Sequence, residues 1–342
     1  MNVILCDSSW EAAWDAFVRA RPDASFYHRY GWLRVNTRAF GHPTFAFGAV
    51  ENGALVGILP VVQVKTPIFG NLGCSMPFVN FGGVVAASPA VELELLAAAE
   101  ALVARKGLKY LEIRSTRPTA RELPTSTRKV SMTIDLTPGA DALFAAFKTG
   151  HRQEIRRAYK HGLSARTGGV EMLDDFHAIL ATCWRDLGTP FYRKSYFRML
   201  FAEFGDAIRI TMVFSGDTPV AAEMSAFHDG VVEGMWLGTL AEYRRQMAGY
   251  VLYWEAIKYA CENGHARYHL GRSTADSNAE TFKKKWNASA TQLYWQYIMP
   301  PGQEMPSLNP DSPKYRMAID LWRRLPVAVT RLVGPSLARG IP

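Results

Sequence analysis

Several signatures that would assign a function quickly are missing from this 342-residue sequence. The four cysteines, Cys6, Cys74, Cys183 and Cys261, are far apart and form no C-x-x-C pair, so neither a zinc knuckle nor a disulfide framework is predicted. The sequence also has no Cys/His cluster and no Gly-x-Ser-x-Gly segment. It therefore disfavours metal-dependent and serine-nucleophile mechanisms, and we expect no bound metal.

Long hydrophobic runs are missing as well. The first residues, MNVILCDSSWEAAW, have no basic segment before their short apolar run, and Asp7 and Glu11 interrupt that run. No stretch approaches the roughly 18–20 apolar residues that a membrane-spanning helix needs. We therefore expect a cytoplasmic protein.

The residues that are present describe a folded, basic protein. Its apolar content of 48% is typical of globular chains, and its length suggests two domains. The 39 Lys and Arg exceed the 31 Asp and Glu, which gives a net charge of +8. This excess favours an anionic partner such as a phosphate group, a nucleic acid or an acidic membrane surface.

Hydrophobic periodicity and turn residues predict the same order of elements twice. The first half is expected to contain a helix around residues 10–18, a hairpin of strands 44–50 and 54–64, a helix at 92–106 and a strand at 108–114. After the connector 117–128, the second half is expected to contain helices at 141–161, 171–186 and 194–204, strands at 207–215, 219–228 and 231–239, a helix at 247–263 and a strand at 267–270. The two halves also share Tyr-x-x-x-Arg-Ser-Thr, at 110–116 and 268–274, which indicates a duplication.

Four segments of the second half resemble the FemAB-related transferases, which carry two GNAT-like domains in one chain. They are His151-Arg152-Gln153-Glu154-Ile155-Arg156-Arg157-Ala158, Gly162-Leu163, Gly271-Arg272-Ser273 and Phe282-Lys283-Lys284-Lys285-Trp286. The resemblance implies an α+β fold of two tandem GNAT-like domains, each with a mostly antiparallel sheet flanked by helices. We expect the first domain at 1–135, the second at 136–300 with the active site, and a basic amphipathic tail at 301–342.

Two further segments are similar to the FemAB-like proteins that accompany PEP-CTERM exosortase and exopolysaccharide systems. They are Pro77-Phe78-Val79-Asn80-Phe81-Gly82-Gly83 and the tail residues Trp322-Arg323-Arg324-Leu325-Pro326 with Gly334-Pro335. One position departs from the family, because His269 stands where an acidic residue often precedes Gly-Arg-Ser.

The strongest catalytic candidates lie in a predicted short helix at 278–286. A lysine beside a reacting carbonyl stabilises the developing oxyanion, and an adjacent aromatic ring excludes water. The resemblance implies this role for Lys283, with Phe282 beside it, although a basic solvent-exposed helix face would have the same pattern. Glu223, in an apolar strand, is a candidate general base whose burial would raise its pKa, as is His228 at the end of that strand.

Two groups of basic residues are candidates for binding an anionic co-substrate. Arg244, Arg245, Gln246 and Gly249 lie between a strand and a helix, where a GNAT loop cradles the pyrophosphate of coenzyme A, although Val251 breaks the loop's pattern. Lys148, Arg152, Arg156 and Lys160 recur every fourth residue on one predicted helix face, and Arg272 with Ser273 follows a strand. For each, a structural or solvated role remains the alternative.

The predicted function is transfer of an acyl or aminoacyl group to an amine acceptor, in cell-envelope or exopolysaccharide synthesis. Acyl-CoA or aminoacyl-tRNA is the expected co-substrate, without a tightly bound cofactor. The alternative is a non-catalytic binding or scaffold protein of a surface-polysaccharide pathway. The tail residues 314–337 mix apolar side chains with arginines and are expected to dock on the protein or, alternatively, to contact the inner face of the membrane.

Overall fold

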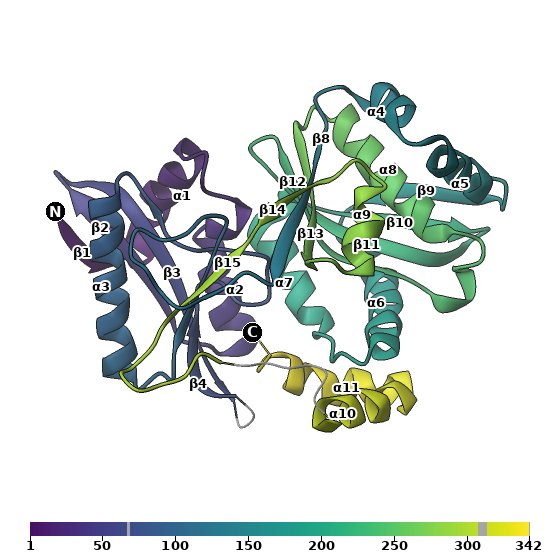
Figure 1. The fold of residues 1–342 in the computed structure, drawn as a ribbon. Coiled ribbons are helices and arrows are strands. Elements are labelled where there is room, and N and C mark those ends of the chain that lie inside the picture. The colour runs from purple at the N-terminus through teal and green to yellow at the C-terminus, as the bar shows by residue number, and fades with distance from the viewer. Residues whose placement is uncertain (67–68, 307–312, 342) are drawn as a thin grey trace. The chain divides into compact units, whose positions relative to one another are not determined.

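The computed structural model describes residues 1–66, 69–306 and 313–341 (Figure 1). The chain forms two compact units. Unit 1 comprises Met1–Ser131, Thr291–Ser307 and Gly340–Pro342, and unit 2 comprises Met132–Ala290 and Leu308–Arg339. The chain therefore returns to unit 1 after it has passed through unit 2, whereas consecutive domains at 1–135 and 136–300 were expected from the sequence.

Unit 1 is a mixed sheet with helices. Its helices are α1 (Glu11–Ala20), α2 (Gly31–Phe40) and α3 (Pro89–Lys106). Its strands are β1 (Asn2–Leu5), β2 (Thr44–Glu51), β3 (Ala54–Thr66), β4 (Gly70–Cys74), β5 (Val85–Ala86), β6 (Leu111–Ser115), β7 (Thr125–Ser126) and β15 (Tyr294–Ile298). The strand order is β1-β2-β3-β4-β6-β15-β7, with β5 on β3. Leu95, Leu96 and Ala99 of α3 pack on the sheet to form the core.

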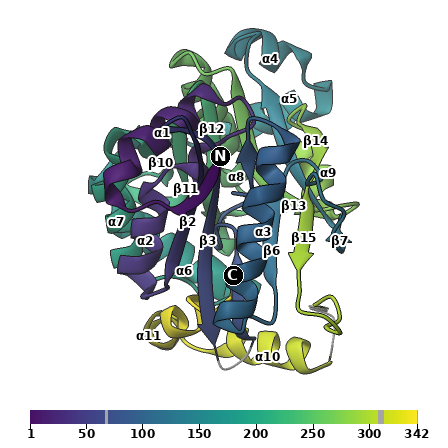
Figure 2. The ribbon, with the colours of Figure 1, turned by 90° about the vertical axis from the view of Figure 1, so that its left-hand side faces the viewer.

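Strand β15 belongs to the first sheet although it follows all the other strands in the chain (Figure 2). It pairs antiparallel with β6, from Tyr294↔Ser115 to Ile298↔Leu111, and on its other side with β7. The buried Gln296 side chain also accepts a hydrogen bond from the backbone N–H of Thr119, 177 residues earlier, at 2.7 Å. Residues of the second half thus complete the first sheet.

Unit 2 repeats the plan. Its helices are α4 (Ala140–Ala146), α5 (Thr149–Tyr159), α6 (Leu173–Leu187), α7 (Lys194–Phe204), α8 (Ala248–Glu262), α9 (Asn278–Lys284), α10 (Pro313–Arg324) and α11 (Val327–Ala338). The strands of its sheet are β8 (Lys129–Asp135), β9 (Leu163–Gly168), β10 (Ile208–Ser215), β11 (Thr218–His228), β12 (Val231–Thr239), β13 (Arg267–Thr274) and β14 (Ser289–Gln292). Their order is β14-β8-β13-β12-β11-β10-β9.

Both sheets place the shared Tyr-x-x-x-Arg-Ser-Thr segment in the same topological position. In unit 1 it covers β6, which runs parallel to β4, and in unit 2 it ends β13, which runs parallel to β12. In each unit the strand follows a long helix, α3 or α8. The predicted duplication is therefore present in the fold.

Two local predictions differ from the structure. The helix expected at 141–161 is two helices, because Phe147 and Lys148 have extended backbone, with ψ of 147° and 142°. Lys148 and Lys160 consequently lie at the ends of α5 rather than within one long basic face. The helix expected to reach Trp286 ends at Lys284.

The structure also bears on the cysteines and on membrane insertion. Cys6, Cys74 and Cys183 are buried, Cys261 is half-buried, and all four are free thiols. Burial raises the pKa of Cys6 to about 11 and that of Cys183 to about 12, so these thiols are unreactive. Among the residues that the structure describes, no helix is long and apolar enough to cross a membrane.

Candidate active site

The sheet of unit 2 opens between β12 and β13. Their parallel register runs only from Val231↔Arg267 to Glu233↔His269, although β12 continues to Thr239 and β13 to Thr274. The carboxyl ends of both strands therefore diverge, which is where open sheets present ligand-binding groups.

Glu223 lies on β11, beside this opening. The register between β11 and β12 shifts between Met224 and Ser225, which is a β-bulge, and bulges re-aim the side chains around them. The Glu223 side chain is almost fully buried, at 1% exposure. Tyr268 donates its phenolic hydrogen to Glu223 Oε1 at 2.6 Å, and Ser225 Oγ donates to the same oxygen at 3.3 Å.

The surroundings of Glu223 make it a weak acid. Burial raises the pKa of its carboxyl to about 7, against the opposing effects of the Tyr268 and Ser225 hydrogen bonds and of the positive charge on Lys283. Within the described part of the chain, no group forms a hydrogen bond with its second oxygen, Oε2. One carboxylate oxygen is therefore anchored by hydrogen bonds, and the other is buried without a hydrogen-bond partner among the described residues.

Gly234 of β12 leaves the space that the Glu223 carboxyl occupies. A Cβ atom at Gly234 would lie 2.6 Å from Glu223 Oε1 and 3.1 Å from the carbonyl oxygen of His269. A side chain at this position would force the Glu223 carboxyl out of its hydrogen bonds with Tyr268 and Ser225.

Lys283 is the one buried lysine of the Lys283-Lys284-Lys285 run. Lys284 and Lys285 are exposed and pair with Glu280 and Glu154, as a solvated face would. Lys283, at 8% exposure, points inward and donates to the carbonyl oxygens of Gly271 at 3.2 Å and Arg272 at 3.1 Å.

The burial of Lys283 changes its acidity. Desolvation lowers the pKa of its ammonium to about 8, while Glu223 acts in the opposite direction. Lys283 and Glu223 are therefore electrostatically coupled, and both titrate close to neutral pH. Perturbed, coupled groups of this kind are a feature of functional sites.

Aromatic side chains pack around the C-terminal end of α9. Phe282 contacts the rings of Tyr250 and Tyr253 edge-on, at centroid distances of 5.6 and 5.4 Å. Tyr253 also stacks on the fully buried Trp286 at 5.4 Å. This wall lowers the local dielectric around Lys283 and strengthens its electrostatic interactions.

The loop 244–249 lies where β12 leads into α8. Arg244 and Arg245 are exposed, Met247 has a left-handed backbone with φ of 62°, and α8 begins at the next residue. Arg157 of α5 donates to the Met247 sulfur at 3.3 Å, which adds a cation beside the start of α8. The first N–H groups of a helix have no intrahelical partner, so this terminus can receive an anion.

The other predicted anion-binding residues have structural partners or different surroundings. Arg152 donates to the carbonyl oxygen of Ala145 and to Thr149 Oγ1, both at 3.2 Å, and the Arg156 guanidinium lies over the Phe144 ring at 5.4 Å. The contacts with Ala145 and Phe144 fasten α5 to α4. Arg272 and Ser273 lie at the end of β13 with Lys283, so the structure brings them to the site, and their binding roles stay predictions.

Sequence reasoning overlooked Tyr268, Ser225 and Gly234 as members of the site. In the sequence, Tyr268 stood out only as part of the repeated Tyr-x-x-x-Arg-Ser-Thr segment. The signal for Ser225 is its spacing, because residues two apart on a strand, such as Glu223 and Ser225, share a strand face. His269, which replaces an acidic residue of the resembled family, pairs with Glu233 of β12 at 2.8 Å. A neighbouring strand thus supplies the carboxylate. His228 pairs instead with Asp229, at 3.1 Å.

Within the described ranges, no group of three His, Cys, Asp or Glu side chains is placed to hold a metal ion.

Comparison with known proteins agrees with the fold. Residues 145–284 match the model of the acetyltransferase (GNAT) domain. The crystal structure of FemX superposes with a TM-score of 0.67 at 13% identity, and the match covers 93% of this chain and 100% of that one. The fold is a tandem GNAT fold.

Two further solved structures are similar to this chain in fold. The C-terminal domain of a putative lysylphosphatidylglycerol synthetase from Agrobacterium fabrum has a TM-score of 0.58 at 13% identity, covering 85% of this chain and 92% of that one. A tandem GNAT protein from the clavulanic acid biosynthesis pathway has a TM-score of 0.56 at 11% identity, covering 87% and 99%. None of the curated proteins compared matches this sequence.

Proposed function

We propose that this tandem GNAT protein is an N-acyltransferase that moves an activated acyl or aminoacyl group to an amine acceptor. The observation that carries the proposal is the buried Glu223, whose pKa of about 7 suits a general base at neutral pH, beside the opening between β12 and β13. A purely structural carboxylate would gain nothing from an environment that destabilises its charge.

In the proposed reaction, Glu223 Oε2 takes a proton from the acceptor amine. The amine nitrogen then attacks the acyl carbonyl carbon, and a C–N bond forms. When the tetrahedral intermediate collapses, the C–S bond of an acyl-CoA or the C–O ester bond of an aminoacyl-tRNA breaks. The leaving sulfur or oxygen then acquires the proton, so no covalent enzyme intermediate is needed.

Lys283 is proposed to stabilise the developing oxyanion. Its ammonium has three N–H donors, and two are occupied by the carbonyl oxygens of Gly271 and Arg272. These bonds hold the charge in place before the substrate arrives, which is what electrostatic preorganisation requires. Phe282 is proposed to exclude water from this charge together with Tyr253.

The anionic co-substrate is proposed to bind at the start of α8, through Arg244, Arg245, Gln246 and Gly249. Acyl-CoA and aminoacyl-tRNA both carry phosphates that such a terminus can receive. Arg152, Arg156, Arg272 and Ser273 remain proposed contacts for the rest of the anion. The name of the lysylphosphatidylglycerol synthetase favours aminoacyl transfer, and that of the clavulanic acid pathway protein, which mentions AcCoA, favours acyl-CoA.

The proposed setting is the cytoplasm and the synthesis of a cell-envelope component or an exopolysaccharide. Support for it comes from the Pro77–Gly83 segment and the tail residues that resemble exosortase-associated proteins. That the second half of the chain, and not the first, carries the active site is likewise a proposal.

The test separates the two donors. The protein is incubated with acetyl-CoA or with aminoacyl-tRNA and a panel of amines, and amide products are detected by mass spectrometry. We expect products with one donor class, lost in Glu223→Gln and retained in Glu94→Gln, which removes an exposed carboxylate on α3. A protein that forms no amide with either donor, and whose melting temperature coenzyme A does not raise, would be a scaffold instead.

A further inference from the structure

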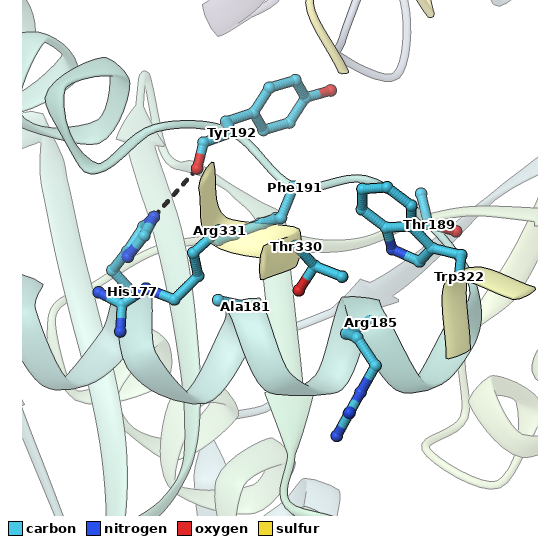
Figure 3. Close-up of a pocket in the computed structure, with 9 residues that line it drawn as sticks. All are labelled: His177, Ala181, Arg185, Thr189, Phe191, Tyr192, Trp322, Thr330 and Arg331. Atoms are coloured by element: carbon cyan, nitrogen blue, oxygen red, sulfur yellow. Dashed lines mark hydrogen bonds between the residues drawn. The ribbon is translucent and has the colours of Figure 1, made fainter. Parts of the chain in front are cut away.

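The tail helices α10 and α11 dock on α6 through one face. Ile319 packs against Gly188, whose φ of +80° ends α6 and whose absent Cβ leaves room for the Ile319 side chain. The backbone of Leu325 accepts a hydrogen bond from Arg185 at 2.9 Å. Figure 3 shows Trp322 and Thr330 of the tail against this part of unit 2. The docking expected for the tail is therefore present.

The opposite face of both helices is apolar and exposed. Met317 and Leu321 of α10 are four residues apart and are 72% and 63% exposed. Leu332 of α11 is 77% exposed, and Val329 and Val333 lie beside it at helical spacing and are also exposed. These five residues form what we call the tail face.

Arginines accompany the tail face. Residues 316–339 contain five Arg and one Asp, a net charge of +4 (5 − 1). Arg324 and Asp320 border Met317 and Leu321 on the same shallow surface, whereas Arg331 lines the pocket where α11 meets α6, beside His177 (Figure 3). Exposed large apolar side chains inside a basic rim are the pattern of helices that lie in a membrane interface.

We propose that the tail face docks on the surface of a bilayer that contains anionic lipids. The apolar side chains would insert at the level of the headgroups, and the arginines would contact lipid phosphates. A lipid surface fits better than a second copy of this chain, because two copies meeting through this face would bring together two tails that each carry a net charge of +4. The proposal concerns α10 and α11 alone and does not depend on the transferase reaction.

Vesicle co-sedimentation of the full chain tests the proposal. Vesicles of phosphatidylcholine alone are compared with vesicles that also contain phosphatidylglycerol. We expect binding to the anionic vesicles only, weakened by added salt. Arg324→Glu should weaken it by about fivefold or more, and Leu332→Asp by about tenfold or more.

Matched variants on α3 serve as controls. Leu93→Asp and Arg105→Glu make the same chemical changes at exposed positions in unit 1 and should leave binding unchanged. The melting temperature of each variant checks that it folds. Equal loss in the α3 variants, or no binding to anionic vesicles, would overturn the proposal. Self-association that Leu332→Asp abolishes, without vesicle binding, would assign the face to a second copy and overturn it as well.

Discussion

The buried carboxyl of Glu223 should leave a signature in the pH dependence of stability, which can be measured without knowing the substrate. The pKa of Glu223 rises from the ordinary value of 4.5 to about 7 in the folded protein. The folded state therefore binds this proton more tightly than the unfolded chain does. The resulting stability is fully present below pH 4.5 and is lost as the pH rises through about 7.

The size of the effect follows from the shift. Each pKa unit corresponds to about 1.4 kcal/mol, so the difference between 4.5 and about 7 amounts to about 3 kcal/mol. Glu223→Gln removes the titration and keeps an oxygen that can accept the Tyr268 hydrogen bond. We expect the free energy of unfolding of the wild type, relative to Glu223→Gln, to fall by about 3 kcal/mol between about pH 4 and about pH 8.

Urea unfolding at several pH values measures this difference. Hydrogen exchange of peptides from β11 and β12 assigns it to unit 2, because the two units need not unfold together. Glu94→Gln, at an exposed position, is the matched control and should follow the wild type. Curves for the wild type and Glu223→Gln that stay parallel across this range would refute both the buried charge and its role as a base.

Three further substitutions probe the same site. Lys283→Met should reduce kcat/KM for amide formation by roughly 10²-fold or more. The pKa of Lys283 is lowered from 10.5 to about 8, so the unfolded chain binds this proton more tightly than the folded protein does. The wild type should therefore gain stability relative to Lys283→Met as the pH rises from about 8 to 10.5. Gly234→Ala should lower the free energy of unfolding by about 1–3 kcal/mol, because its Cβ would lie 2.6 Å from Glu223 Oε1. The control Gly150→Ala, which has open space around it, should not lower it. Equal urea midpoints for Gly234→Ala and the wild type would contradict this prediction. Tyr268→Phe removes a 2.6 Å hydrogen bond to the carboxylate and should raise the pKa of Glu223 by about one unit. The pH profile of kcat/KM should shift upward accordingly. An unchanged profile would exclude a hydrogen bond from Tyr268 to Glu223.

Local sequence patterns predicted many of the elements of unit 2. Helix α7 at Lys194–Phe204 and strand β12 at Val231–Thr239 were expected with these bounds, because helical and alternating apolar spacing and the turn glycines act over a few residues. The break in the basic helix was not foreseen, since it depends on the extended backbone of Phe147 and Lys148. Strand β15 was also missed, because its pairing with β6 joins residues far apart in the chain.

The candidate site was predictable in part. An apolar strand singled out Glu223, but its partner Tyr268 is 45 residues away and comes from another strand. Three consecutive lysines could not be ranked by sequence, because successive helical residues point about 100° apart and only packing decides which one is buried. In the structure Lys283 is the buried lysine. Gly234 leaves room for the Glu223 carboxyl because glycine has no Cβ atom.

The late return of the chain to unit 1 has a consequence for biosynthesis. During translation, residues 1–131 leave the ribosome first, then the contiguous part of unit 2, and only afterwards β15. Until that moment β6 is a bare strand edge, which is a template for improper pairing. Maturation of the nascent polypeptide should thus run from the second half back to the first, and a gene fragment encoding residues 1–131 alone should yield an insoluble product.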